Sequence, residues 1–353
     1  MISVIIPVFQ VQDSLRACLD SVLGQQFSGV EVIAVDDHSP DRSGEILDSY
    51  AKRDGRVHVV HLERNAGPGN ARNTGFGLSR GQYVWFVDGD DWIADGALAA
   101  IAGRLGTPGE ANRPDVLLIG FDRVQPSGHA EPNAWRHVLS APAPAVFTLS
   151  DRPDVLKLTM TGWSKVIRRD YMAGLGVSFG PGIHEDVPVT CTLLLAAERI
   201  SVLDRVCYHY RQQRTGALTN TPSDDNFAVF SRYREVFDFV AERPGELSQF
   251  RTALFDRMIW HYTTILGDRG CVPRRSRREF FRRASSDFAR YRPDGYTYPP
   301  GAHGMKYRLV ERGSYDLYMA VQPVNQARVG FRRAVHGGLR GGPSRRVTAG
   351  PAS

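Results

Sequence analysis

Three carboxylates stand close together in this sequence, directly after an apolar run. In GQYVWFVDGDDWI (81–93), the run at 83–87 is followed by Asp88, Asp90 and Asp91. Carboxylates gathered at one place repel each other, and Mg²⁺ or Mn²⁺ prefers oxygen ligands of this kind. A cation held there could also neutralise a diphosphate as it leaves a reacting group. An Asp-x-Asp sequence is equally well explained by an ordinary turn or a helix cap, so the metal interpretation depends on the apolar strand that precedes it.

The hydrophobic pattern predicts the elements that would position these carboxylates. It predicts strands at 2–8, 30–35, 57–62 and 83–87, and helices at 13–27, 41–53 and from 69 onward. Strands that alternate with helices over short links predict a parallel sheet with helices packed on its faces. Ligands of such sheets collect beyond the carboxyl ends of the strands. The residues expected at those ends are Pro7, Val8, Phe9, Asp36, Asp37, Glu63, Arg64, Asn65, Asp88, Gly89, Asp90 and Asp91.

The rest of the chain is less regular and suggests a second region. From about 105 to 150 the sequence is rich in Gly, Pro and Ala around one strand at 115–124, which we interpret as an insertion or a substrate-side loop. From about 226 the pattern is helical. We predict an α/β fold with a Rossmann-like, mostly parallel central sheet, followed by a smaller helical C-terminal region. The expected boundaries are 1–220 (a nucleotide-binding half, 1–105, and an acceptor half, 106–220), 221–340 for the helices, and 341–353 for a disordered tail.

Composition is typical of a globular protein with a sizeable core, since 42% of the 353 residues are hydrophobic and 23% are charged. No apolar run reaches the roughly eighteen residues that cross a membrane. The start, MISVIIPVFQVQDS, is interpreted as a first strand rather than a signal peptide. Cysteines 18, 191, 207 and 271 show neither zinc spacing nor a disulfide framework, which predicts reduced core thiols in a cytoplasmic protein.

The net charge of +6 is concentrated late in the chain, in PRRSRREFFRRASSDFARYR (273–292) and after Arg328. A basic surface favours phosphate polymers, nucleic acid or acidic lipid, and a solvated helix face is the alternative of equal weight. The aromatic residues of this segment have near-helical spacing, which predicts a core-facing stripe rather than base stacking. They are Phe280, Phe281, Phe288 and Tyr291.

Several separated motifs, in the right order over residues 1–215, resemble those of family 2 glycosyltransferases of the GT-A fold. The motifs are the initial strand with IIPVF, VIAVDDHSPDRSGEILDSYAKRD, RNAGPGNARNTGFGLSRGQYVWFVDGDDW and HEDVPVT. FTLSDRPDVL and LLLAAERISVLDRVCYHYRQQR are more narrowly similar to the glycosyltransferase domain of actinobacterial bifunctional CDP-glycerol glycerophosphotransferases of the teichoic-acid type. The resemblance implies only the glycosyltransferase half of such proteins.

The resemblance implies a role for residues at each motif. Pro7, Val8 and Phe9 would frame the nucleobase, and Asp37 would contact the base or ribose. Asn65 and Arg72 would line the nucleotide pocket, with Arg72 near the diphosphate, and Arg211 and Arg214 would close over it. Asp90 would ligate Mn²⁺ or Mg²⁺ directly, Asp91 would support it, and Asp88 would contact the ribose or sugar. Asp186 would be the catalytic base, with Glu185 as its neighbour. Lys165 matches a family lysine without an assigned role.

Elementary chemistry agrees with this assignment. Sugar transfer requires that the acceptor hydroxyl lose its proton as it attacks the anomeric carbon, and one carboxylate, Asp186, can accept it. The leaving diphosphate requires charge compensation, which a cation and arginines supply. A single direct displacement inverts the anomeric centre and needs no second carboxylate on the opposite face. An isolated Glu-Asp pair more often begins a helix, so this interpretation depends on the motifs upstream.

The sequence also departs from the family. Ala217 stands where the family often has Ser, which leaves Thr219 as the candidate hydroxyl in that lid. His209 is interpreted as a core histidine, with metal ligation as the alternative. The glycines of AGPGNARNTGFG do not follow the first strand, which argues against a dinucleotide fingerprint.

We therefore expect an inverting, metal-dependent hexosyltransferase. The alternatives are a basic module that binds an anionic polymer, and a scaffold on a degenerate glycosyltransferase fold. The expected donor is a nucleotide sugar, UDP by family habit. The expected acceptor is a polyol phosphate, a glycan or a lipid-linked intermediate at the inner membrane face, where peripheral contact with anionic lipid is a hypothesis. Nucleic acid is not an expected partner, and the helices from 226 onward leave homo-oligomerisation open.

Overall fold

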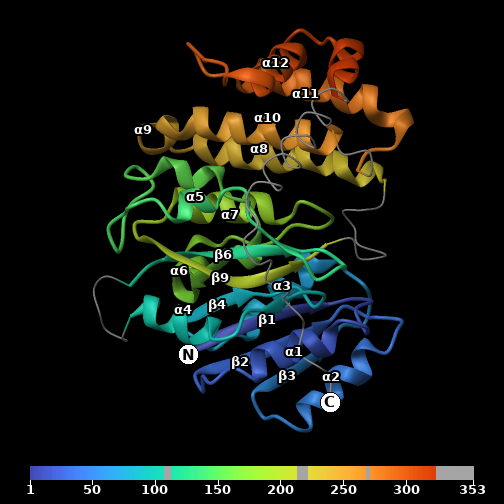
Figure 1. The fold of residues 1–353 in the computed structure, drawn as a ribbon, viewed down its shortest axis with the longest axis vertical. Coiled ribbons are helices and arrows are strands. Elements are labelled where there is room, and N and C mark those ends of the chain that lie inside the picture. The colour runs from blue at the N-terminus through green and yellow to red at the C-terminus, as the bar shows by residue number, and fades with distance from the viewer. Residues whose placement is uncertain (107–112, 213–221, 268–270, 323–353) are drawn as a thin grey trace. The chain divides into compact units, whose positions relative to one another are not determined.

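The computed structural model describes residues 1–106, 113–212, 222–267 and 271–322 (Figure 1). The described residues form two compact units, one within 1–212 and one within 222–322. The predicted site residue Arg214, Ala217, Thr219 and the expected tail at 341–353 lie outside the described residues. Within the described part, no helix has the length and apolar character needed to cross a membrane.

The described part of the first unit is built on a nine-stranded mixed sheet of order β3-β2-β1-β4-β8-β6-β9-β5, with β7 paired to β6. The strands are β1 (Ile2–Val8), β2 (Val30–Asp36), β3 (Val57–His61), β4 (Tyr83–Phe86), β5 (Trp92–Ile93), β6 (Val116–Val124), β7 (Ala130–Pro132), β8 (Lys165–Arg168) and β9 (Ile200–Arg211). Strands β1 to β4 are parallel, as predicted. Strand β8 runs antiparallel to β4 and β6, whereas β9 runs parallel to β6.

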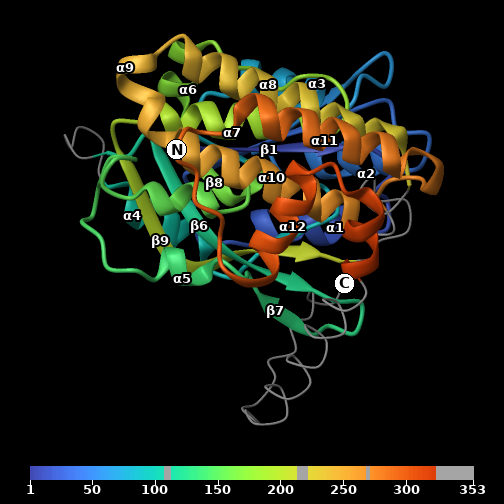
Figure 2. The same ribbon diagram turned by 90° about the horizontal axis from the view of Figure 1, so that it is seen from above.

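Helices cover both faces of the parallel strands, because the residues of these strands are apolar on both sides. The helices of this half are α1 (Leu15–Leu23), α2 (Ser43–Ala51), α3 (Pro68–Leu78) and α4 (Ala97–Leu105). Val32 and Ala34 of β2 belong to a core shared with α1, α2 and α4, whereas Ile33 and Val35 pack with Ala71 of α3. Alternate residues of one strand thus serve opposite faces. In both views α3 and α1 lie on opposite sides of β1 (Figures 1 and 2).

The strand expected at 115–124 is confirmed as β6, but the interpretation of this region as an insertion or loop is wrong for that strand. Strand β6 lies inside the sheet, between β8 and β9, and only the short β7 hairpin extends from it. The pattern was ambiguous because the partners of β6 come from much later in the sequence. The remaining helices of the unit are α5 (Arg136–Leu139), α6 (Arg169–Leu175) and α7 (Asp186–Leu195), with 3₁₀ turns at Pro153–Lys157 and Gly162–Ser164.

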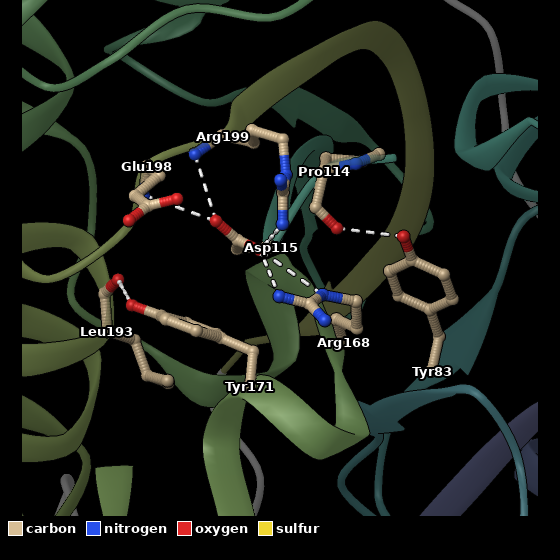
Figure 3. A network of polar contacts seen from close by, with 8 residues as sticks. All are labelled: Tyr83, Pro114, Asp115, Arg168, Tyr171, Leu193, Glu198 and Arg199. Atoms are coloured by element: carbon tan, nitrogen blue, oxygen red, sulfur yellow. Dashed lines mark hydrogen bonds and ion pairs between the residues drawn. The ribbon is translucent and has the colours of Figure 1, made fainter. Parts of the chain in front are cut away.

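Asp115, directly before β6, ties the ends of three strands together (Figure 3). Its buried carboxylate accepts hydrogen bonds from Arg168 at 2.5 and 3.1 Å and from the Arg199 side chain at 3.0 Å. The backbone N–H groups of Glu198 and Arg199 add two more, at 3.2 and 2.9 Å. This network lies at the end of the sheet opposite the carboxyl ends of β1, β2 and β4, because Arg168 pairs with Tyr83 at the start of β4.

The second unit is helical, as predicted. Its helices are α8 (Ala228–Ala241), α9 (Pro244–Leu247), α10 (Arg251–Gly267), α11 (Arg277–Tyr291) and α12 (Gly301–Glu311), with 3₁₀ turns at Asp224–Phe227, Ser248–Phe250 and Arg274–Ser276. The core-facing stripe expected on α11 is confirmed, since Phe280, Phe281, Phe288 and Tyr291 are all buried. Most exposed arginines of this segment are paired with acids of the same unit. The pairs are Arg275 with Asp224, Arg278 with Asp316, Arg282 and Arg283 with Glu279, and Arg292 with Glu311.

Candidate active site

The three carboxylates that follow β4 lie together, as their spacing predicted. Ligand oxygens of Asp88, Asp90 and Asp91 are all within 4.8 Å of one another. Asp91 is only 1% exposed. Burial, followed by the negative charges of Asp90 and Asp88, raises the pKa of Asp91 well above its usual range. Such a cluster is unfavourable by itself and would be stabilised by a cation.

Strand β9 holds Asp91 in place. The Tyr208 hydroxyl donates to Oδ2 of Asp91 at 2.5 Å, and the backbone N–H of Arg211 donates to Oδ1 at 2.7 Å. The Arg211 side chain donates from Nε to the Asp90 carbonyl at 2.8 Å, and its guanidinium lies 4.7 Å from the ring centroid of Trp92. The predicted site residue Arg211 therefore meets the carboxylate cluster. Tyr208 was missed by sequence reasoning, because nothing local indicates that β9 pairs with β5.

Arg72 joins this cluster to the second acidic motif. Its Nη2 donates to Asp88 Oδ1 at 2.8 Å, and its Nη1 forms a short ion pair with Glu185. Burial alone would lower the pKa of Arg72, but the charges of Asp88 and Glu185 outweigh burial and hold that pKa above its usual range. Arg72 therefore stays charged and brings the ends of β4 and the start of α7 together.

Asp186 is the first residue of α7 and is partly buried. Burial, followed by the charge of Glu185, raises its pKa to about 7, although Arg72 and Lys165 oppose the shift. The Lys165 ammonium is itself fully buried and donates to the carbonyls of Thr159 and Thr161 at 3.0 and 2.9 Å. A carboxyl group with a pKa near neutrality can take up and release a proton under physiological conditions.

The ends of β1 and β2 form the expected nucleotide side. The buried carboxylate of Asp37 accepts hydrogen bonds from the N–H groups of Ala66 and Gly67, both at 2.8 Å, and Asn65 Oδ1 accepts from Gly67 at 3.2 Å. Asp37 and Asn65 thus fix the turn into α3, and their contact with a nucleotide stays a prediction. Past β1, Phe9 is 39% exposed, which is unusual for a large apolar side chain in this unit.

The structure also places His209 and the end of β1, which the sequence had assigned to the core and to the nucleotide side. His209 is buried beside Trp92, with 5.3 Å between ring centroids, and burial lowers its pKa. This packing favours the core interpretation over metal ligation. Pro7 and Val8 end β1 next to Asp36 of β2 in the paired register, which places them at the carboxyl edge of the sheet.

Comparisons with known proteins identify the family and the fold. Residues 3–175 match the model of the family described as "Glycosyl transferase family 2". The "Uncharacterized glycosyltransferase EpsJ" of Bacillus subtilis is 34% identical over 233 residues, which are 63% of this chain and 64% of that protein. The "Poly(ribitol-phosphate) beta-glucosyltransferase" of Bacillus spizizenii is 30% identical over 225 residues, 61% of this chain and 33% of that protein. The chain thus spans less than two thirds of the length of these curated relatives.

A solved structure shows the fold. The crystal structure of S. aureus TarS 1–349 in complex with UDP-GlcNAc is similar with a TM-score of 0.72 and 22% sequence identity, over 92% of this chain and 91% of that one. The predicted GT-A fold with a helical C-terminal region is therefore confirmed. The narrower resemblance to actinobacterial bifunctional proteins stays a prediction.

Proposed function

Because this chain belongs to glycosyltransferase family 2, we propose that it moves a sugar from a nucleotide diphosphate to an acceptor hydroxyl, with inversion of the anomeric centre. One observation carries the proposal: the carboxylate cluster after β4 and the acidic pair that starts α7 meet on a single arginine, Arg72. Arg72 and Glu185, which are 113 residues apart in the sequence, are thereby brought to one edge of the sheet.

The carboxylates fit a hard divalent cation. Their oxygens converge within 4.8 Å, and their mutual repulsion is relieved by positive charge. Both oxygens of Asp91 already accept hydrogen bonds, so we assign Asp91 a supporting role and Asp90 the direct ligand role. Asp88 would contact the metal or the sugar side of the donor. When bound, Mn²⁺ or Mg²⁺ would neutralise charge on the leaving diphosphate.

The chain's own residues supply the remaining steps. Asp186 accepts the proton of the acceptor hydroxyl as that oxygen bonds to the anomeric carbon, while the bond from this carbon to the diphosphate oxygen breaks. Glu185 keeps the pKa of Asp186 high enough to hold this proton near neutral pH, because its charge adds to burial. Arg72 and Arg211 place positive charge beside the cluster where the diphosphate would leave.

UDP is the proposed nucleotide. The similar structure named above holds UDP-GlcNAc, which supports a UDP-hexose or UDP-N-acetylhexosamine donor here. Pro7, Val8, Phe9 and Asp37 would frame its uridine at the ends of β1 and β2. Arg214 would add to the diphosphate contacts.

A polyol-phosphate or related cell-envelope glycan is the proposed acceptor. The support is the similarity to a poly(ribitol-phosphate) glucosyltransferase. The arginines of 273–292 add little to this argument, because acids of the same unit neutralise most of the exposed ones. The same ion pairs weaken the case that these arginines bind an anionic membrane.

The decisive experiment is a panel of nucleotide sugars with Mn²⁺, scored by protection against thermal unfolding and by sugar transfer. We expect Asp90→Ala to abolish metal-dependent turnover. Asp186→Asn should lower kcat about 10²- to 10⁴-fold, because a general base contributes about that much, while donor protection persists. Asp95→Ala is the matched control, since Asp95 is an exposed carboxylate nearby. Transfer that survives Asp90→Ala without metal, or protection by no nucleotide sugar, would contradict the proposal.

A further inference from the structure

The segment that leads to Asp186 has little regular structure of its own. Residues 176–185, between the end of α6 and the start of α7, contain no helix or strand. Gly176, Gly182 and His184 have positive φ angles of 64°, 81° and 59°. Backbone groups in such a segment need partners from elsewhere in the fold.

Helix α3 lies against this segment with one face and supplies partners for the backbone of Phe179. A Cβ atom at Gly69 would lie only 2.4 Å from the Gly180 carbonyl oxygen, so the helix and the segment are in direct contact. Three and four residues later, Arg72 pairs with Glu185 and Asn73 contacts Phe179. Positions separated by three and four residues share a face of an α-helix, so one face of α3 lies along the segment.

Asn73 makes the contact that fixes the main chain. Its Nδ2 donates to the Phe179 carbonyl at 2.8 Å, and the Phe179 N–H donates to Oδ1 at 2.9 Å. The two bonds set the orientation of the carboxamide, since the exchanged orientation would oppose donor to donor and acceptor to acceptor. Both backbone groups of one residue are thus held by a single side chain. The Phe179 ring is buried edge-on against Phe86 of β4, with 5.0 Å between centroids.

We propose that Asn73 is a positioning residue for the general base, a role that rests on the proposed function. It holds the backbone of Phe179 and acts on Asp186 through the segment between them. The ring of Phe179 packs on Phe86 at the end of β4, so the same clamp fixes the base relative to the strand that directly precedes the proposed metal ligands. A displacement of about 1 Å at a reacting group can cost about 10²-fold in rate.

Asn73→Ala tests the proposal against Asn70→Ala, which removes an exposed carboxamide from the same helix. For Asn73→Ala we expect kcat to fall about 10- to 100-fold, the range for a misplaced catalytic group. The donor KM and the affinity for UDP should change less than about 3-fold, because the clamp serves the base. An unchanged kcat, or an equal loss in donor affinity, would overturn the assignment.

Amide hydrogen exchange over residues 176–185 separates this proposal from the proposed function. Exchange there should rise in Asn73→Ala and not in Asn70→Ala, whether or not a donor is found. Absence of sugar transfer by the unaltered protein would contradict the proposed function alone. Unchanged amide exchange in Asn73→Ala would contradict the role proposed for Asn73. Asn73→Asp is the second variant, since it keeps the acceptor for the Phe179 N–H and removes the donor. Asn73→Asp should show the same rise in amide exchange over residues 176–185 while the rest of the protein stays folded. Global unfolding of both variants would show that Asn73 serves general stability and would overturn the proposal.

Discussion

Replacing Glu185 by glutamine should move the acid limb of the pH–rate profile. The structure places the pKa of Asp186 at about 7, through burial first and the charge of Glu185 second. Glu185→Gln removes the second cause and keeps an oxygen that can accept from Arg72. The positive charge of Arg72, no longer neutralised by Glu185, would act on Asp186 in the same direction. Both changes favour the ionised carboxylate, so the pKa of Asp186 should fall.

The size of the effect follows from the titration curve. A carboxyl group of pKa about 7 is roughly one-tenth ionised at pH 6, and a fall of about one pKa unit makes it about half ionised. One unit corresponds to about 1.4 kcal/mol between the two protonation states, a modest change for the loss of a neighbouring charge. The rate at pH 6, relative to the plateau at high pH, should therefore rise about five-fold in the variant.

The assay is kcat/KM for the donor between pH 5 and 9 (on the order of nine points) at metal concentrations far below saturation, because kcat/KM then reports groups of the enzyme before metal and donor bind. Glu45→Gln is the matched control, since the Glu45 side chain is exposed on α2 and should leave the acid limb in place. An acid limb near pH 4 in the unaltered protein, the usual range of a free carboxyl, would refute the assignment of Asp186. A limb near 7 that Glu185→Gln does not move would refute the electrostatic cause.

The remaining predictions concern stability and use urea unfolding. Asp115→Ala should lower the free energy of unfolding by about 2–3 kcal/mol, at the low end for breaking a buried ion pair, because the two arginines that pair with Asp115 are partly solvated. Asp170→Ala is the control: the Asp170 side chain is 84% exposed, and its loss should lower the free energy of unfolding by less than about 0.5 kcal/mol. Gly75→Ala should cost about 1–3 kcal/mol by overpacking, since its Cβ would lie 2.4 Å from Ile5. Gly77→Ala on the same helix meets nothing within 4 Å and should be neutral or stabilising, so equal effects at the two glycines would contradict this account.

The sequence was sufficient for those parts of the fold that local pattern determines. The strands expected at 2–8, 30–35, 57–62 and 83–87 match β1 to β4 within about one residue, because apolar runs and short links leave few alternatives. The clustering of Asp88, Asp90 and Asp91 was predictable for the same reason. Three residues after one strand stay close in space whatever the rest of the chain does.

The other half of the site depends on contacts distant in sequence, which periodicity does not reveal. The strand at 115–124 was predicted, but the place of β6 inside the sheet was not, because its partners β8 and β9 begin about 50 and 80 residues later. Tyr208 was missed because its role requires β9 to cross beside β5 and reach Asp91. Asn73 lies in the same motif as the predicted Arg72, yet its function is visible only once α3 is seen against Phe179.

Charge balance explains why one arginine can serve two acidic motifs. Five carboxylates meet in this region, and three cations in the described structure act on them. The carboxylates are Asp88, Asp90, Asp91, Glu185 and Asp186, and the cations are Arg72, Lys165 and Arg211. Two negative charges are left when all are ionised, and protonation of Asp186 near pH 7 removes one of them.

A divalent cation would balance the remaining two charges and keep Asp186 ionised, because added positive charge favours the charged form of a carboxyl group. A nucleotide diphosphate brings negative charge and would work in the opposite direction. Metal and donor binding should therefore favour each other, and each should shift the titration of the base in its own direction. The carboxylates after β4 and the base on α7 are therefore electrostatically coupled. For this reason we expect Glu185→Gln to change the pH dependence of the rate.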